Sequence, residues 1–138
     1  MLSKKVKVLT DKLIATYLAV GVQPSDIADT VFEDNYIEMS LSKKNKQLIM
    51  TFTFEEFDEE GQQILNSMRY TYSEAKQLNR VEQKVGKGRF KVQWDRYDDL
   101  MSILSELLSL VPSKAARESL IETLPQDLKA FTISSIAA

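Results

Sequence analysis

Residues 87–111, KGRFKVQWDRYDDLMSILSELLSLV, form a candidate strand that leads almost directly into the longest apolar helix of the chain. From Arg89 to Trp94, charged or polar residues alternate with apolar ones, which is the period of a half-buried strand. Asp95 then suits the start of a helix, because a carboxylate there accepts backbone N–H groups and interacts favourably with the helix dipole. The stretch therefore predicts a strand followed by a core helix.

The predicted helix from Arg96 to Val111 has one apolar half and one polar half. At about 100° per residue, the apolar half collects Tyr97, Leu100, Met101, Ile103, Leu104, Leu107, Leu108, Leu110 and Val111. The polar half holds Asp98, Asp99, Ser102, Ser105, Glu106 and Ser109. An apolar half this wide is typical of a helix in the core, so we expect the sheet to lie beneath it.

Three stretches upstream carry apolar residues at alternating positions. They are 36–42, with Ile37, Met39 and Leu41; 47–55, with Leu48, Met50, Phe52 and Phe54; and 63–72, with Ile64, Met68, Tyr70 and Tyr72. The polar segments 43–46 and 58–61 contain an asparagine and a glycine, respectively, and suit the turns between them. The pattern predicts a three-stranded antiparallel meander.

Residues 73–85 have two interpretations. Ala75, Leu78, Val81 and Val85 are spaced for a helix capped by Ser73. Alternatively, a short helical turn near Ser73 precedes a fourth strand over 77–85, which pairs with 89–94 through the glycines of 86–88. We favour the second interpretation, because a Gly-Lys-Gly segment suits a hairpin turn.

Helices are expected at both ends of the chain. Near the N-terminus, apolar residues recur at helical spacing before Gly21, which is placed to end the helix: Leu2, Val6, Leu9, Leu13, Tyr17 and Val20. Ser25 is expected to cap a short helical turn before the first strand. After Pro112, Ser113 is expected to cap a further helix, and Pro125 suits the start of a last helix over about 126–136.

Together these elements predict an α+β fold. We expect one globular domain over residues 1–138, with an antiparallel sheet of four to five strands formed by a meander and a hairpin. An N-terminal helix and a C-terminal run of two to three helices are expected to pack on one face of this sheet. The sequence contains no internal repeat and no linker that would mark a second domain.

The composition excludes several kinds of chemistry. The chain has 138 residues, a net charge of −2, and neither cysteine nor histidine. Disulfides, cysteine nucleophiles, Ser-His-Asp triads and zinc sites built from histidine or cysteine are therefore excluded. No apolar run approaches the ~20 residues of a membrane span, so we expect a cytoplasmic protein that does not contact a membrane. We also expect no enzymatic activity, no cofactor and no metal site.

Acidic residues gather between the second and third predicted strands. The cluster consists of Glu55, Glu56, Asp58, Glu59 and Glu60. Hard cations bind such oxygens, but a calcium-binding loop needs them spread along twelve residues, and that spacing is missing. We therefore interpret the cluster as a solvated turn.

Basic residues gather in the predicted hairpin 76–94. Within 76–91 only Glu82 opposes six cations, which are Lys76, Arg80, Lys84, Lys87, Arg89 and Lys91. We expect Lys84, Arg89 and Lys91 to form a solvent-facing stripe on the face opposite Phe90, Val92 and Trp94. Lys84, Lys87, Arg89 and Lys91 are thus the candidate contacts to a partner or to nucleic acid.

The order of the predicted elements resembles that of the class I type III secretion chaperones. These are small, acidic, dimeric proteins that bind an unfolded segment of a partner. The resemblance rests on element order and size alone, and the two additional C-terminal helices depart from it.

For function, we expect a non-enzymatic protein-binding module that acts as an adaptor, chaperone or regulator. Its partner is another protein, and a homodimer is one expected arrangement. The alternative is a nucleic-acid-binding accessory protein that acts through the basic hairpin 76–94.

Overall fold

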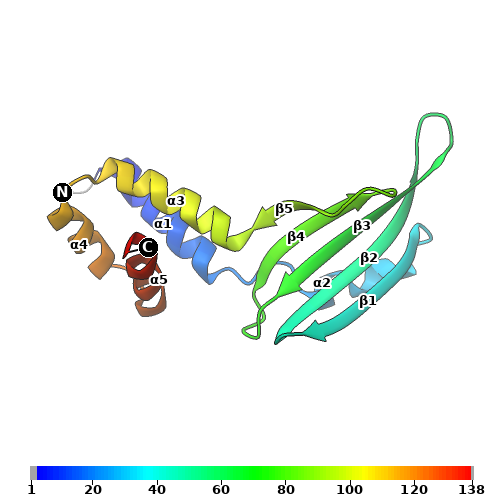
Figure 1. The fold of residues 1–138 in the computed structure, drawn as a ribbon, viewed down its shortest axis with the longest axis horizontal. Coiled ribbons are helices and arrows are strands. Elements are labelled where there is room, and N and C mark those ends of the chain that lie inside the picture. Colours follow the sequence, from blue (N-terminus) through cyan, green and yellow to red (C-terminus); the bar gives the residue numbers. More distant parts are fainter. Residues whose placement is uncertain (1–2, 138) are drawn as a thin grey trace. The chain divides into compact units, whose positions relative to one another are not determined.

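A five-stranded antiparallel sheet occupies the middle of the chain, between one N-terminal helix and three C-terminal helices (Figure 1). The computed structural model describes residues 3–137. The element order confirms the predicted α+β fold class, and the sheet has the larger of the two predicted strand numbers. None of the described helices is both long enough and apolar enough to cross a membrane.

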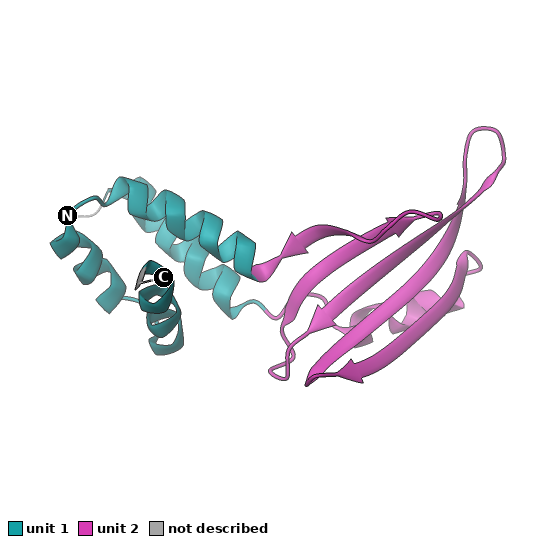
Figure 2. Ribbon diagram, in the orientation of Figure 1, with its two compact units in different colours: residues 1–19, 97–138 teal, residues 20–96 magenta. Residues whose placement is uncertain are grey.

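The chain divides into two compact units, drawn in different colours in Figure 2. The helical unit combines the residues up to Ala19 with those from Tyr97 onward, and the sheet unit runs from Val20 to Arg96. Each unit has its own cluster of buried apolar side chains. The single domain expected for residues 1–138 stays a prediction, because this division does not measure whether the two units unfold together.

The strands follow one another in the sheet in the order of the sequence. They are β1 (Tyr36–Lys44), β2 (Gln47–Phe57), β3 (Gln63–Tyr72), β4 (Leu78–Val85) and β5 (Lys91–Asp95), and every neighbouring pair is antiparallel. Asn45 and Lys46 connect β1 to β2 with φ angles of 52° and 65°. Two consecutive positive φ angles are typical of the tight turn that matches the twist of a hairpin, and this confirms the predicted meander.

The segment before β4 is a tight turn. The backbone N–H of Ser73 donates to the carbonyl of Gln77 over 2.9 Å, and Lys76 has a φ of 64°. This turn joins β3 directly to β4, so the strand interpretation of 77–85 is confirmed. The helical turn expected near Ser73 is wrong, because these residues are occupied by the reversal of the chain.

One face of the sheet carries the apolar cluster of the sheet unit. Its buried members are Met50, Phe52, Tyr72 and Leu78. Val22 and Ile27 pack against this cluster from the segment before the sheet, which forms α2 (Pro24–Ile27) and the 3-10 helix η1 (Ala28–Phe32). The hydroxyl of Tyr72 donates to the carbonyl of Val22 over 2.7 Å and fixes this segment to the sheet.

Gln23, rather than Ser25, caps α2. Its backbone N–H donates to Asp26 Oδ2 over 2.8 Å, and its side chain accepts from the backbone of Asp26, which makes a reciprocal capping box. The prediction of a short helical turn here is correct, but its cap lies two residues earlier than expected. The reason is that Pro24 occupies the first helical position, where its missing N–H costs nothing.

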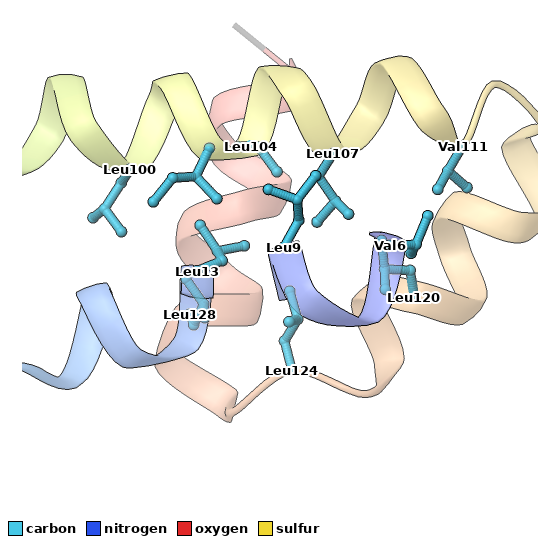
Figure 3. Close-up of a cluster of buried hydrophobic side chains, with 11 residues drawn as sticks. Val6, Leu9, Leu13, Leu100, Leu104, Leu107, Val111, Leu120, Leu124 and Leu128 are labelled. Carbon is cyan, nitrogen blue, oxygen red and sulfur yellow. The ribbon is translucent and has the colours of Figure 1, made fainter. Parts of the chain in front are cut away.

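The helical unit consists of α1 (Lys4–Leu18), α3 (Arg96–Leu110), α4 (Lys114–Glu122) and α5 (Gln126–Ala137). Figure 3 shows side chains from all four helices converging on one cluster. Its buried members are Val6, Leu9, Leu13, Leu100, Ile103, Leu104, Leu107, Val111, Leu120, Leu124 and Leu128. The hydroxyl of Ser113 accepts from the N–H of Ala116, which confirms the predicted cap of α4.

The buried stripe of α3 is narrower than the predicted apolar half. Tyr97 and Leu110 are exposed, whereas the buried leucines of α3 lie in a cluster supplied by α1, α4 and α5. We expected the sheet beneath this helix, but the buried partners of its apolar side chains come from other helices. Leu2, expected on the stripe of α1, lies outside the described residues, and α1 ends at Leu18 rather than at Gly21.

Candidate functional site

The four basic residues predicted to contact a partner lie on and around the β4–β5 hairpin. Lys87 and Arg89 are exposed between the two strands, and Lys91 is exposed at the start of β5. Lys84, near the end of β4, is half-buried. The structure thus brings all four onto one hairpin, as the sequence predicted, but it does not bring them onto one face.

A bulge between β4 and β5 separates Lys84 from Lys91. Trp94 pairs with Val81, but the next residue of β4, Glu82, pairs with Val92, so Gln93 is an extra residue in β5. Residues directly opposite each other in an antiparallel pair share a face. Lys91 is opposite Gln83, and one residue further along β4, Lys84 is opposite Ser67 on the other face. The predicted stripe of Lys84, Arg89 and Lys91 on one face is therefore wrong.

Phe90, which the alternation placed opposite the cations, packs against one of them, Lys84, and against Arg69 of β3. The guanidinium carbon of Arg69 lies 4.0 Å from the centre of the Phe90 ring, and the Lys84 ammonium lies 5.8 Å from it. The guanidinium of Arg96 lies 5.4 Å from the centre of the Trp94 ring, and Trp94 also packs against the apolar cluster of the sheet. Both rings that were candidates for stacking on bases therefore have contacts within the protein.

The ion pair between Arg69 and Glu82 lies beside this ring. Arg69 Nε and Nη2 donate to the two carboxylate oxygens of Glu82 over 3.0 and 2.8 Å. The hydrogen bond from Arg69 lowers the pKa of Glu82, although partial burial acts in the opposite direction. A carboxylate held ionised in this way is a structural group rather than a proton donor.

Only part of the acidic cluster forms the predicted turn: Asp58, Glu59 and Glu60 lie between β2 and β3, whereas Glu55 and Glu56 belong to β2 and pair with β3. Asp58 Oδ1 accepts hydrogen bonds from the backbone N–H groups of Glu60 and Gln62 over 2.9 and 2.8 Å, and Gly61 has a φ of 79°. The aspartate thereby replaces part of the missing strand pairing, as turn aspartates commonly do. Over residues 3–137, no three acidic side chains lie in an arrangement that could hold a metal ion.

Two hollows open on the sheet unit. The first, of about 430 Å³, is lined by Gln23, Pro24, Lys43, Lys46, Gln47, Leu48, Tyr72, Ser73, Glu74 and Lys76. The second, of about 540 Å³, is lined by Gln47, Ile49, Thr51, Arg69, Thr71, Asn79, Arg80, Glu82 and Asp95. In the second hollow each carboxylate faces an arginine, and Arg80 Nε donates to Asp95 Oδ2 over 3.0 Å. Neither hollow contains a pair of carboxylates suited to acid–base chemistry.

Three exposed apolar side chains lie within seven residues where η1 leads into β1, and the sequence analysis missed them. We call Val31, Phe32 and Ile37 the Phe32 patch; their exposed fractions are 40%, 83% and 54%. A Val-Phe pair at the end of a short helical segment, followed by three polar residues, is the signal that marks these side chains in the sequence. Alternation alone assigned Ile37 to a strand face and left Phe32 without a role.

No protein-family model matches the chain, and comparisons with curated proteins and with solved structures find no significant match. The resemblance in element order to class I type III secretion chaperones therefore receives no support from these comparisons.

Proposed function

We propose that the chain is a non-enzymatic protein-binding module that holds a segment of another protein on the Phe32 patch. The observation that carries this proposal is the 83% exposure of the Phe32 side chain. A single exposed apolar side chain is ordinary, but three within seven residues of the chain offer a partner apolar surface from which it can remove water. Exposed aromatic side chains are also the residues that most often anchor a protein interface.

The charge around the patch indicates the chemistry of the partner. Between Pro24 and Ser42 the chain has five carboxylates, Asp26, Asp29, Glu33, Asp34 and Glu38, and no lysine or arginine. An acidic rim attracts basic segments and repels acidic ones, and it acts more on the association rate than on the final affinity. The segment that fits best therefore combines large apolar side chains with lysine or arginine.

Peptide binding followed by fluorescence anisotropy tests this proposal. We expect short basic peptides with apolar anchors to bind, and both acidic peptides of equal apolar content and basic peptides without anchors to fail. Phe32→Ser should abolish binding without unfolding the protein, because the side chain is almost fully exposed. Phe57→Ser is the matched control, since Phe57 is 63% exposed but lies at the end of β2. Equal binding by the wild type and Phe32→Ser, or no binding to any of the peptides, would refute the proposal.

The proposal places the protein in the cytoplasm, which a chain without cysteine suits. The nucleic-acid alternative loses support from the geometry of the hairpin. Lys84 and Lys91 lie on opposite faces, and the Phe90 ring is already stacked against Arg69.

A further inference from the structure

The strand β1 forms an edge of the sheet that can accept another strand. Within the described part of the chain, β1 pairs with β2 alone, and Figure 1 shows it at the end of the sheet. All nine of its residues except Tyr36 and Met39 are exposed, and the side chain of Leu41 is 57% exposed. An edge strand presents a row of backbone N–H and C=O groups that pair readily with a further strand.

The sequence of β1 is complementary to itself when one copy is reversed. If Leu41 of one strand lies opposite Leu41 of an antiparallel copy, Ser40 lies opposite Ser42, Met39 lies opposite Lys43, and Glu38 lies opposite Lys44. We propose that β1 pairs with β1 of a second copy of this chain, around a two-fold axis at Leu41. This inference goes beyond the proposed function, because it names a second partner and the backbone edge of β1 as its binding surface.

The register of β1 on β2 supports these pairings. Glu38 is opposite Thr53 and Lys44 is opposite Gln47, so both side chains lie on the same face of the sheet. Leu41 is opposite Met50 and therefore lies on the other face, which carries the apolar cluster. Self-pairing at Leu41 consequently forms two ion pairs on one face. On the other face it brings the two Leu41 side chains together, flanked by Met39 and Lys43.

The charges also select this register over its neighbours. A two-fold axis in an antiparallel pair passes between a residue and its own copy, so the axis moves in whole residues along β1. With the axis at Ser40, Glu38 faces Ser42 and the lysines face uncharged residues. Lysine on an edge strand normally discourages pairing, and only a partner that supplies a carboxylate opposite Lys44 offsets this effect.

The association is expected to be weak, because one strand pair buries less surface than a standard interface. Sedimentation velocity over a range from about 1 to about 500 µM should show a concentration-dependent dimer of the wild-type chain. Glu38→Lys alone and Lys44→Glu alone should each weaken the dimer by about tenfold or more, since each places two pairs of like charges directly opposite. The double variant should recover dimerisation, and an equimolar mixture of the two single variants should form a mixed dimer.

Glu59→Lys and Lys87→Glu are the matched controls, because they reverse exposed charges outside β1 and should leave the dimer unchanged. A chain that remains monomeric at every concentration would overturn the proposal. A dimer that responds to the controls as strongly as to Glu38→Lys would overturn it as well.

Cysteine cross-linking tests the axis directly, because the natural chain has no cysteine. Residues opposite each other in an antiparallel pair have Cα atoms about 4.5–5.5 Å apart, within the range of a disulfide. Under mild oxidation Leu41→Cys should form a covalent dimer quickly. Val92→Cys, on the far edge of the sheet at a similar exposure of 52%, should remain monomeric. Equal rates of cross-linking for the two variants would show that Leu41 does not lie opposite its own copy.

Discussion

Arg69 and Glu82 join β3 to β4 through two parallel hydrogen bonds, and the guanidinium of Arg69 lies over the ring of Phe90. The carboxylate of Glu82 is largely buried, with a side-chain exposure of 12%. One arginine thus orders a neighbouring strand on one side and the β4–β5 hairpin on the other.

This pair makes the stability of the protein sensitive to acid. The hydrogen bond from Arg69 lowers the pKa of Glu82 in the folded state below its ordinary value of 4.5. The stabilisation is therefore complete above that value and is lost as the pH falls through the lower, folded-state pKa. Urea unfolding from neutral pH down to about pH 3 should show a smaller loss of stability for Glu82→Gln than for wild type. An equal loss of stability with falling pH in the wild type and in Glu82→Gln would contradict the prediction.

Gly21 is expected to tolerate no side chain. Its φ is 78°, and a Cβ there would lie 2.8 Å from Cβ of Leu78. Gly61 has a φ of 79° but open space around it, so it isolates the cost of the backbone conformation. We expect Gly61→Ala to lower the free energy of unfolding by about 1–2 kcal/mol. Gly21→Ala should lower the free energy of unfolding by roughly a further 1–3 kcal/mol, because of the clash with Leu78. Equal losses in chemical denaturation would show that the Val20–Val22 segment moves away from β4 without cost.

Leu104 in α3 is buried among leucines from the other helices, and its neighbour Ser105 is exposed. Leu104→Ala should lower the free energy of unfolding by about 2–5 kcal/mol, because it removes buried surface and leaves a cavity. Ser105→Ala should change it by less than about 1 kcal/mol. Circular dichroism at the helical minimum measures both, and similar losses would show that the buried face is wrongly assigned.

The same pair of variants tests whether the chain is a single cooperative domain. Trp94 is the only tryptophan and lies in the sheet unit, so its fluorescence reports that unit. In a single domain, Leu104→Ala shifts the fluorescence transition together with the helical signal. A fluorescence transition that stays in place would show that the two units unfold separately.

The basic hairpin is expected not to bind nucleic acid. At physiological salt neither the wild type nor the variant Lys84→Glu/Arg89→Glu/Lys91→Glu should bind single- or double-stranded oligonucleotides in a filter-binding or anisotropy assay. Phosphate contacts release counterions, so real binding would weaken steeply as salt rises. Salt-sensitive binding by the wild type, lost in the triple variant, would support the alternative function.

Alternation in the sequence predicted the strands β1, β2 and β3, because each has one face in the apolar cluster and the pattern follows directly from burial. In β1 it wrongly placed Ile37 on the face of Met39 and Leu41, because the register shifts between Tyr36 and Glu38 and leaves Ile37 as an extra residue. The alternation also failed at β5. Residues 90–94 alternate between apolar and polar without interruption, although Gln93 is an extra residue in the pairing of β5 with β4. A bulge depends on which residues pair across two strands, and no pattern within one strand contains that information. Alternation therefore assigned Lys91 to the wrong face of the sheet, and it predicted a stripe of Lys84, Arg89 and Lys91 that the structure does not contain.

The helix wheel of α3 shows a related limit. It gave the direction of the buried face correctly, since Leu100, Leu104 and Leu107 are all buried. A wide apolar half indicates how much of a helix's surface must be buried. It does not indicate whether a sheet or other helices bury that surface. The Phe32 patch was missed for the opposite reason: an apolar side chain left in solvent follows no periodic pattern, and its exposure is visible only in three dimensions.

The helical unit is built from both ends of the chain, and this has a consequence for synthesis on the ribosome. The apolar stripe of α1 is translated before the sheet, but the residues that bury Val6, Leu9 and Leu13 lie in α3, α4 and α5 and are translated after it. All the strands of the sheet unit are made in between, and the sheet has the chance to fold while α1 still lacks its partners. The apolar stripe of α1 therefore stays without the partners that bury it until α3, α4 and α5 have been translated.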